Sequence, residues 1–202
     1  MKKILLLSIV LCSLAVGVAL AEEPGPTASL KPVLHDLTSV LGDESLKGKA
    51  HLAERRAKIM SLIKRGYDFR EMSKRILGKT WRKIDDKERD HFTTLMTKLL
   101  ENVYIGKLES YSGQDIEFVA ETVKEDRAQV TTLVENDNAK IPLHYIMKNT
   151  DSGWMVYDIN IEGVSLVSNY REQFKSILRR DDYKGLIKVL EDKNRSFLEE
   201  AQ

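Results

Sequence analysis

Asp158 is the residue in this sequence best suited to chemistry, because it lies among apolar residues in the run 154–161. A carboxylate buried among apolar side chains can serve as a general base, and a cone-shaped α+β sheet could hold an isomerase of this kind. The alternative is a structural carboxylate that binds backbone groups or pairs with an arginine such as Arg171. The sequence favours the structural role, and Asp158→Asn would separate the two.

Other residues that could do chemistry are scattered. His35, His51, His91 and His144 lie on separate segments without partners at ligand spacing, whereas metal sites need clustered ligands. Residues 136–138 (Asn-Asp-Asn) resemble part of a calcium loop but lack its glycine and distal glutamate, so they predict a hairpin turn. No nucleotide-binding, serine-hydrolase or zinc-protease motif is present. We therefore expect no catalytic residues, no metal and no cofactor.

The N-terminal residues indicate export. Lys2 and Lys3 precede an apolar run, and Ala19-Leu20-Ala21 precedes two glutamates, which is the pattern of a cleavable signal peptide. A retained membrane anchor is the alternative, since the apolar stretch approaches spanning length. We expect residues 1–21 to be removed, together with Cys12, the single cysteine, and the mature protein to be periplasmic.

The charge of the mature chain is close to balanced. The signal segment contains two of the 32 basic residues and none of the 31 acidic ones, so cleavage leaves 181 residues with a net charge of −1. No block of like charges stands out, and we expect no nucleic-acid binding. The length fits one domain, residues 22–202, and we expect a monomer.

The first part of the mature chain has helical periodicity. Ser29 predicts an N-cap for a helix that ends at Gly42, and a second helix is expected over about 48–64. The pairs Asp68/Glu71 and Asp85/Glu88 have capping-box spacing, and they predict a short helix and then a long helix over about 86–110. The apolar positions of these helices are Leu30, Val33, Leu34, Leu37 and Leu41; Leu52, Ile59, Met60 and Ile63; Phe69, Met72 and Ile76; and Phe92, Leu95, Met96, Leu99 and Val103.

The next segment changes to strand periodicity. Short β-branched runs over 116–120, 128–134, 141–147 and 154–161 are separated by turn residues, which predicts a four-stranded antiparallel meander. Helical spacing returns after Gly163. The sequence therefore predicts an α+β fold, in which helices pack on one face of a curved antiparallel sheet. Its parts are helical residues 29–110, sheet residues 115–162 and helical residues 163–199.

These elements leave a surplus of apolar side chains toward one interior space. Alternation places part of the set on one sheet face, and helical spacing supplies the rest. Such residues form either a filled core or the wall of a cavity for an apolar ligand, and composition alone favours the core. The set is Tyr104, Leu108, Leu143, Tyr145, Met147, Val156, Ile161, Val164, Leu166, Tyr170 and Phe174.

Several segments in order along the chain resemble the MlaC family, also called toluene-tolerance auxiliary proteins. The resemblance covers about residues 30–190. The matching segments are Asp68-Phe69-x-x-Met72, Leu77-Gly78-Lys79-x-Trp81-Arg82, Tyr104-Ile105-Gly106-Lys107-Leu108, Tyr111-Ser112-Gly113, Val156-Tyr157-Asp158, Ile161 through Arg171, and Gln173-Phe174.

The resemblance implies a periplasmic phospholipid-binding carrier with a deep apolar cavity between sheet and helices. It further implies that the protein shuttles lipid between an outer-membrane lipoprotein-porin complex and an inner-membrane ABC transporter that carries an MCE-domain protein. Bound phospholipid would be the cargo, and the eleven apolar residues above would form the cavity wall. His144 and Ile146 depart from the charged residues that relatives carry on the outer sheet face, which bears on partner docking.

Overall fold

Capped and apolar helical segments build the first part of the fold. The computed structural model describes residues 24–109, 111, 113–136 and 139–200, so the predicted signal segment and the turn at 137–138 lie outside the described residues. The helices are α1 Pro26–Gly42, α2 Leu52–Gly66, α3 Phe69–Leu77, α4 Asp86–Glu109, α5 Leu166–Arg180 and α6 Asp182–Glu200. Single 3₁₀ turns lie at Glu44–Leu46, Lys49–His51 and Thr80–Arg82.

Helix α1 begins earlier than the sequence predicts. Gly25 is its N-cap and Pro26 lies in its first turn, whereas Ser29 is already helical and its backbone N–H donates to the Gly25 carbonyl at 2.9 Å. Proline suits this place because its fixed φ fits a helix and its missing N–H is not needed in the first turn. The prediction of an N-cap at Ser29 was therefore wrong.

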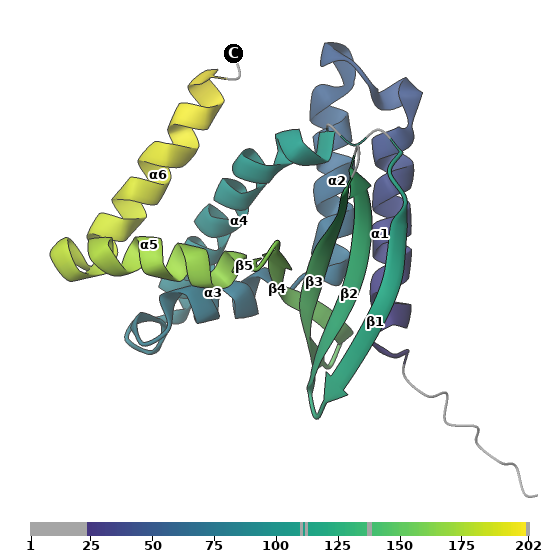
Figure 1. Ribbon diagram of the computed structural model, residues 1–202. Coiled ribbons are helices and arrows are strands. Elements are labelled where there is room, and N and C mark those ends of the chain that lie inside the picture. Colours follow the sequence, from purple (N-terminus) through teal and green to yellow (C-terminus); the bar gives the residue numbers. More distant parts are fainter. Residues whose placement is uncertain (1–23, 110, 112, 137–138, 201–202) are drawn as a thin grey trace, which may run out of the picture.

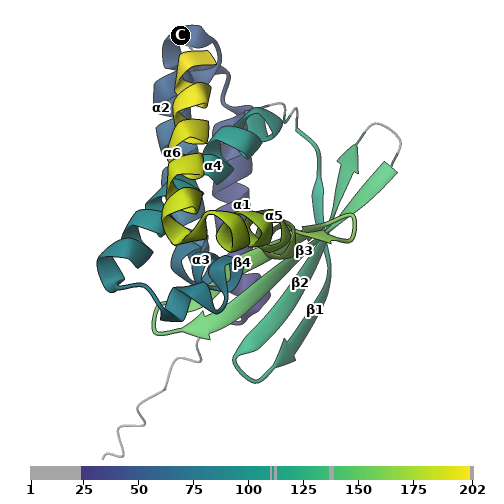
Figure 2. The same ribbon diagram turned by 90° about the vertical axis from the view of Figure 1, so that its left-hand side faces the viewer.

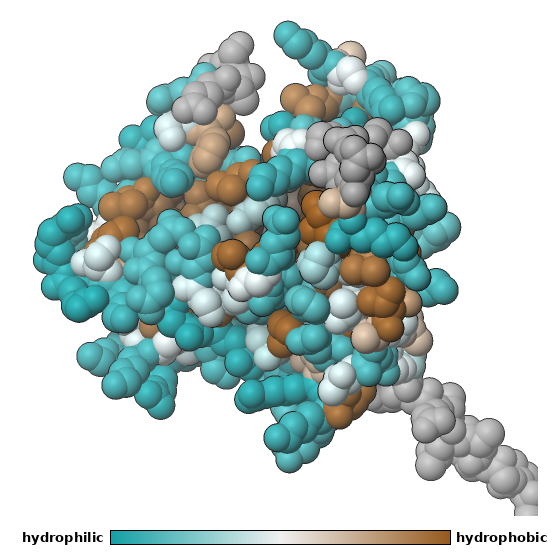
Figure 3. Space-filling view, in the orientation of Figure 1, coloured by the Kyte–Doolittle hydropathy of each residue, from teal (hydrophilic) through white to brown (hydrophobic). Residues whose placement is uncertain are grey.

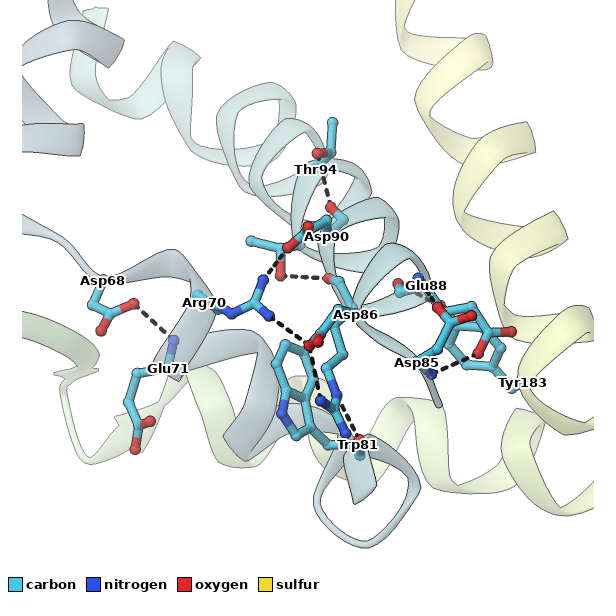
Figure 4. Close-up of polar contacts among 12 residues, drawn as sticks. Asp68, Arg70, Glu71, Trp81, Asp85, Asp86, Glu88, Asp90, Thr94 and Tyr183 are labelled. Carbon is cyan, nitrogen blue, oxygen red and sulfur yellow. Dashed lines mark hydrogen bonds and ion pairs between the residues drawn. The ribbon is translucent and has the colours of Figure 1, made fainter. Parts of the chain in front are cut away.

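Of the two predicted capping boxes, the one at Asp85 is complete, whereas at Asp68 only the N-cap bond forms, because the Asp68 N–H donates to the Val156 carbonyl instead. The Glu88 N–H donates to the Asp85 carboxylate at 2.8 Å, and the Asp85 N–H donates to the Glu88 carboxylate at 3.0 Å, so this box is complete (Figure 4). The Asp68 carboxylate accepts from the Glu71 N–H at 2.8 Å, which caps α3. These bonds satisfy backbone donors that the first turn of a helix leaves free.

The turn between α3 and α4 is fixed by two arginines around a tryptophan. The guanidinium groups of Arg70 and Arg89 lie 5.5 and 5.6 Å from the Trp81 ring. Arg89 also donates to the Trp81 carbonyl at 3.0 Å, and Arg70 pairs with Asp86 at 3.2 Å and with Asp90 (Figure 4). Cation–π and ion-pair contacts thus tie α3 to the start of α4.

The sheet is antiparallel and has five strands in the order β1-β2-β3-β4-β5. They are β1 Ile116–Lys124, β2 Arg127–Asn136, β3 Ala139–Thr150, β4 Gly153–Ile161 and β5 Val164–Ser165. The predicted α+β fold is confirmed, and the strand beyond the expected four is the two-residue β5, which pairs with the end of β4.

A β-bulge in β4 decides which of its side chains face inward. Ile146 pairs with Asp158 but Met147 pairs with Val156, so Tyr157 is an extra residue in β4. Strict alternation would put Val156 and Ile161 on opposite faces, whereas the bulge lets Val156 share a face with Ile159 and Ile161.

The helices lie mainly on one side of the sheet. Figures 1 and 2 show the α1–α2 pair against the sheet, with α5 and α6 extending beyond its β4 edge. The surface in Figure 3 is mostly hydrophilic, with hydrophobic side chains gathered in the angle between α4, α5 and α6. Within the described residues, no helix combines the length and the apolar character needed to cross a membrane.

Candidate functional site

A cavity of about 590 Å³ lies between the inner face of the sheet and helices α1, α2 and α4. Its size falls in the range of small-molecule sites, about 300–1,000 Å³. Most of its wall is apolar. The apolar and aromatic lining residues are Leu34, Leu37, Leu41, Met60, Ile63, Tyr67, Phe69, Met72, Leu100, Tyr104, Ile105, Leu108, Tyr111, Ile116, Val134, Ile141, Leu143, Tyr145, Ile159, Ile161 and Leu166.

The buried residues form three clusters around this space, although a domain of this size usually has one contiguous core. The first cluster joins α3 to α6, the second joins α1 to the sheet, and the third joins α1, α2 and the end of α4. Members of all three line the cavity, which therefore takes the place that a continuous core would fill. These members are Met72 and Leu100; Leu34 and Tyr145; and Leu37, Leu41 and Ile105.

Charged side chains mark where the cavity meets solvent. Lys107, Glu135 and Glu162 line it and are exposed, so they form a rim at the end of α4 and at the ends of β2 and β4. Glu101 also lines the cavity, and its carboxylate pairs with Lys98 at 3.2 Å. The charges thus lie at the edge, and the interior remains apolar.

The tyrosines of the wall stay neutral at physiological pH. Burial raises the pKa of Tyr145 to about 12 and raises the pKa of Tyr67 well above its ordinary value, because a phenolate is poorly solvated inside the protein. Tyr111 donates its hydroxyl proton to the Gln114 carbonyl at 2.8 Å. The aromatic part of the wall therefore adds no charge to the cavity.

Asp158 stabilises the corner between β4 and α5. It is buried, it accepts from the Ser165 hydroxyl at 2.6 Å, and it accepts from the Val167 N–H at 3.0 Å. Ser165 in turn caps α5 by accepting from the Ser168 N–H. Both carboxylate oxygens are engaged, and Asp158 is not among the residues that line the cavity.

Arg171 and His144 form contacts that are structural and not catalytic. Arg171 donates to the Arg75 carbonyl at 2.9 Å, so the pairing with Asp158 that the sequence allowed was wrong. His144 contacts the Thr131 hydroxyl at 3.0 Å on the outer sheet face. Across the described ranges, no group of three potential metal ligands comes together.

Comparison with known proteins assigns the family. A family model described as MlaC protein matches residues 31–192. This chain belongs to the MlaC family. The fold of this MlaC family member is also that of a solved structure, the phospholipid-binding protein from Ralstonia solanacearum in complex with a phospholipid. The TM-score is 0.77 at 24% sequence identity, over 86% of this chain and 98% of that chain. At this identity the likeness establishes the fold alone.

Part of the apolar set predicted from the sequence lies on the cavity wall of this MlaC protein. The predicted residues that line the cavity come from α4, β3, β4 and the start of α5. Contact of these residues with lipid stays a prediction. The residues that line the cavity are Tyr104, Leu108, Leu143, Tyr145, Ile161 and Leu166.

Two of the predicted strand residues instead lie in a packed region. Met147 is 1% exposed and Val156 is 0% exposed, and both belong to the cluster in which α1 covers the sheet through Leu30 and Leu34. They share the inner face of the sheet with Leu143, but farther along the strands. Helix α1 fills the space above them, so the structure does not place them on the cavity wall.

The predicted wall residues near the corner between β4 and α5 also lie outside the cavity wall, but for another reason. Tyr170 and Phe174 pack among α3, α4 and α6, where the Phe174 ring meets Phe92 edge-on at 6.3 Å. Val164 is 56% exposed in the short strand β5. Helix α5 therefore supplies only its first residue, Leu166, to the cavity wall.

Helices α1 and α2 supply wall residues that the sequence reasoning missed. The sequence predicts only that these residues lie on apolar helix faces; they are Leu34, Leu37, Leu41, Met60 and Ile63. Three-four spacing shows that a face is buried, but it carries no signal that distinguishes burial against protein from burial against a cavity.

Proposed function

We propose that this protein binds phospholipid with its acyl chains in the cavity between the sheet and helices α1, α2 and α4. The observation that carries the proposal is the apolar space of about 590 Å³ left among three separate core clusters. The phospholipid complex of the related Ralstonia solanacearum protein supports it.

The energetics agree with such a cargo. Each buried methylene stabilises a bound acyl chain by about 0.8 kcal/mol, so an apolar cavity of this volume gives a large favourable free energy without any polar contact. An empty apolar cavity, by contrast, leaves its lining atoms without contact partners. The exposed charges at the rim can remain in water while the chains are buried.

The cellular role that we propose is that of a periplasmic carrier. It would take lipid between an outer-membrane lipoprotein-porin complex and an inner-membrane ABC transporter with an MCE-domain protein. Membership of the MlaC family supports this role. The near balance of charge also suits a protein that must leave membrane surfaces again. Because the sequence lacks a nucleotide-binding motif, the ABC transporter would supply the energy that makes lipid transport directional.

The proposal is tested by native mass spectrometry of protein purified without a lipid-removal step. We expect bound phospholipid in the wild type and its loss in Ile161→Glu, because an unpaired charge on the apolar wall is costly to bury. Val164→Glu is the matched control, since Val164 is near Ile161 in the chain but exposed. A wild type without lipid, or an equal lipid content in both variants, would contradict the proposal.

An isomerase that uses Asp158 as a base is the second function that the sequence allowed. The structure gives it no support, because Asp158 is bonded to Ser165 and Val167 and does not line the cavity. In the carrier, Asp158→Asn should retain lipid.

A further inference from the structure

A polar depression of about 680 Å³ lies where the end of α2, the start of α3, the middle of α4 and the β3–β4 turn come together. Several of its lining residues, among them Thr94 and Asp151, are exposed, so a ligand can enter it directly from solvent. The complete lining is Lys64, Tyr67, Asp68, Phe69, Thr93, Thr94, Thr97, Lys98, Glu101, Thr150, Asp151, Ser152 and Met155.

Two aromatic rings form part of the wall of this depression. Tyr67 and Phe69 are half-buried, and they stack with their centroids 6.3 Å apart and an angle of 23° between the ring planes. The backbone beside them is fixed, because Tyr67 forms a bridge with Val156 and the Asp68 N–H donates to the Val156 carbonyl at 2.8 Å. Aromatic rings attract cations, and a planar guanidinium stacks on them better than a compact ammonium does.

The threonine hydroxyls of the depression can only accept hydrogen bonds from a ligand. Thr93, Thr94 and Thr97 each donate their hydroxyl proton to an α4 backbone carbonyl, at 2.8, 2.9 and 2.8 Å. Figure 4 shows this bond for Thr94. Thr150 likewise donates to the Gly153 carbonyl at 2.9 Å. Because each proton is committed, these oxygens offer lone pairs to a ligand that carries several N–H donors.

The charges of the lining residues leave a surplus of carboxylates, three against two ammonium groups. Lys98 pairs with Glu101 at 3.2 Å, and one Asp68 oxygen caps α3. In the part of the chain that the structure describes, the Asp151 carboxylate is exposed and has no ion-pair or hydrogen-bond partner, and the same holds for the Lys64 ammonium. A cationic donor that enters the depression therefore meets a free carboxylate together with the threonine oxygens.

We infer that this depression is a docking site for a partner protein that inserts an arginine side chain. A guanidinium has five N–H donors and no acceptor, which matches the acceptor oxygens of the threonines and the Asp151 carboxylate. Its flat face can lie against the stacked rings of Tyr67 and Phe69. The Lys64 ammonium complements a carboxylate that stands beside this arginine in the partner.

An anionic group suits the centre of the depression less well. The threonine hydroxyls have no proton left to donate to it, and the carboxylates of Asp68, Glu101 and Asp151 would repel it. The docking site is also distinct from cargo binding, because an arginine that enters from solvent need not pass through the apolar cavity. Since Asp151 and Lys64 are exposed, salt should weaken the contact.

The test is an NMR titration of the isotope-labelled protein with the blocked peptide acetyl-Gly-Arg-Gly-amide. We expect the backbone amide signals of Thr97, Asp151 and Ser152 to shift. The same peptide with citrulline, which keeps the shape of arginine without its charge, should bind about tenfold more weakly, and the lysine peptide should also bind more weakly. Asp151→Asn should reduce the affinity for the arginine peptide about fivefold, the size typical of one exposed charge pair, and Thr97→Val should reduce it as well.

The matched control is Asp126→Asn, which removes an exposed aspartate from a different β-turn and should keep the wild-type affinity. Equal binding of the arginine and citrulline peptides would overturn the inference, and so would an unchanged affinity in both depression variants. Lipid content, measured by native mass spectrometry, should stay the same in all variants, because Thr97 and Asp151 do not line the apolar cavity. A variant that loses lipid together with the peptide would assign the depression to cargo binding and so refute a separate docking site.

Discussion

Leu143 offers a sharp test of whether the interior is hollow. Its side chain lines the cavity from β3, and it pairs with Ile161 across the β3–β4 ladder. Met147 lies on the same strand and faces the same side, but it is buried in the cluster beneath α1. Leu143→Trp adds an indole to empty space, whereas Met147→Trp adds the same group to a filled one.

The two substitutions should differ in their effects on stability and on cargo affinity. Overpacking a filled core costs about 1–3 kcal/mol, so Met147→Trp should lower the melting temperature, by about 2–4 °C for each kcal/mol in a domain of this size. Leu143→Trp should leave the stability of the lipid-free protein nearly unchanged. If the indole displaces roughly three methylene groups of cargo, binding weakens by about 2.4 kcal/mol, which is roughly 60-fold.

The assay combines thermal unfolding of lipid-free protein with displacement of a fluorescent acyl probe. A hollow interior requires Leu143→Trp to lose probe affinity while it keeps its melting temperature, and Met147→Trp to show the reverse. If both variants unfold at similarly lowered temperatures, Leu143 lies in a filled core and the hollow interior is refuted.

Three further predictions concern stability. Asp158→Asn should cost about 1–3 kcal/mol in chemical denaturation, because one of two buried acceptors becomes a donor, and an unchanged midpoint would contradict the corner role of this residue. Burial raises the pKa of Tyr145 from 10 in the unfolded chain to about 12 in the folded protein, so the free energy of unfolding should fall by about 3 kcal/mol as the pH rises between these values. Tyr145→Phe should flatten this decline in stability with pH. Equal slopes for the wild type and the variant would argue against the raised pKa. Asp85→Ala removes half of a complete capping box and should cost about 1 kcal/mol, with Asp126→Ala in an exposed turn as the neutral control.

Local patterns in the sequence were sufficient for most of the secondary structure. The Asp68 and Asp85 boxes predicted where α3 and α4 begin, because a capping bond joins residues three apart and needs no tertiary partner. Alternation in β3 predicted that Leu143, Tyr145 and Met147 share a face. Here the periodicity is a property of the strand itself.

The candidate site depended on relations that no local pattern contains. The bulge at Tyr157 put Val156 and Ile161 on one side of the sheet, and α1 then covered Val156 but not Ile161. Helix α5 turned Tyr170 toward α3, α4 and α6. In each case the apolar residue type was readable from the sequence, but what lies opposite the side chain was not.

The sequence by itself therefore determined the helices, the strands and the apolar character of the interior, because these follow from residue types at fixed spacings. Only the tertiary structure decided that α1, α2 and α4 stand off from part of the sheet and leave a space of about 590 Å³. The physical reason is that burial of an apolar side chain depends on its exclusion from water, and both a packed core and a cavity wall can satisfy that condition. The distance between elements, set by their packing around the three clusters, separates a core from a binding site.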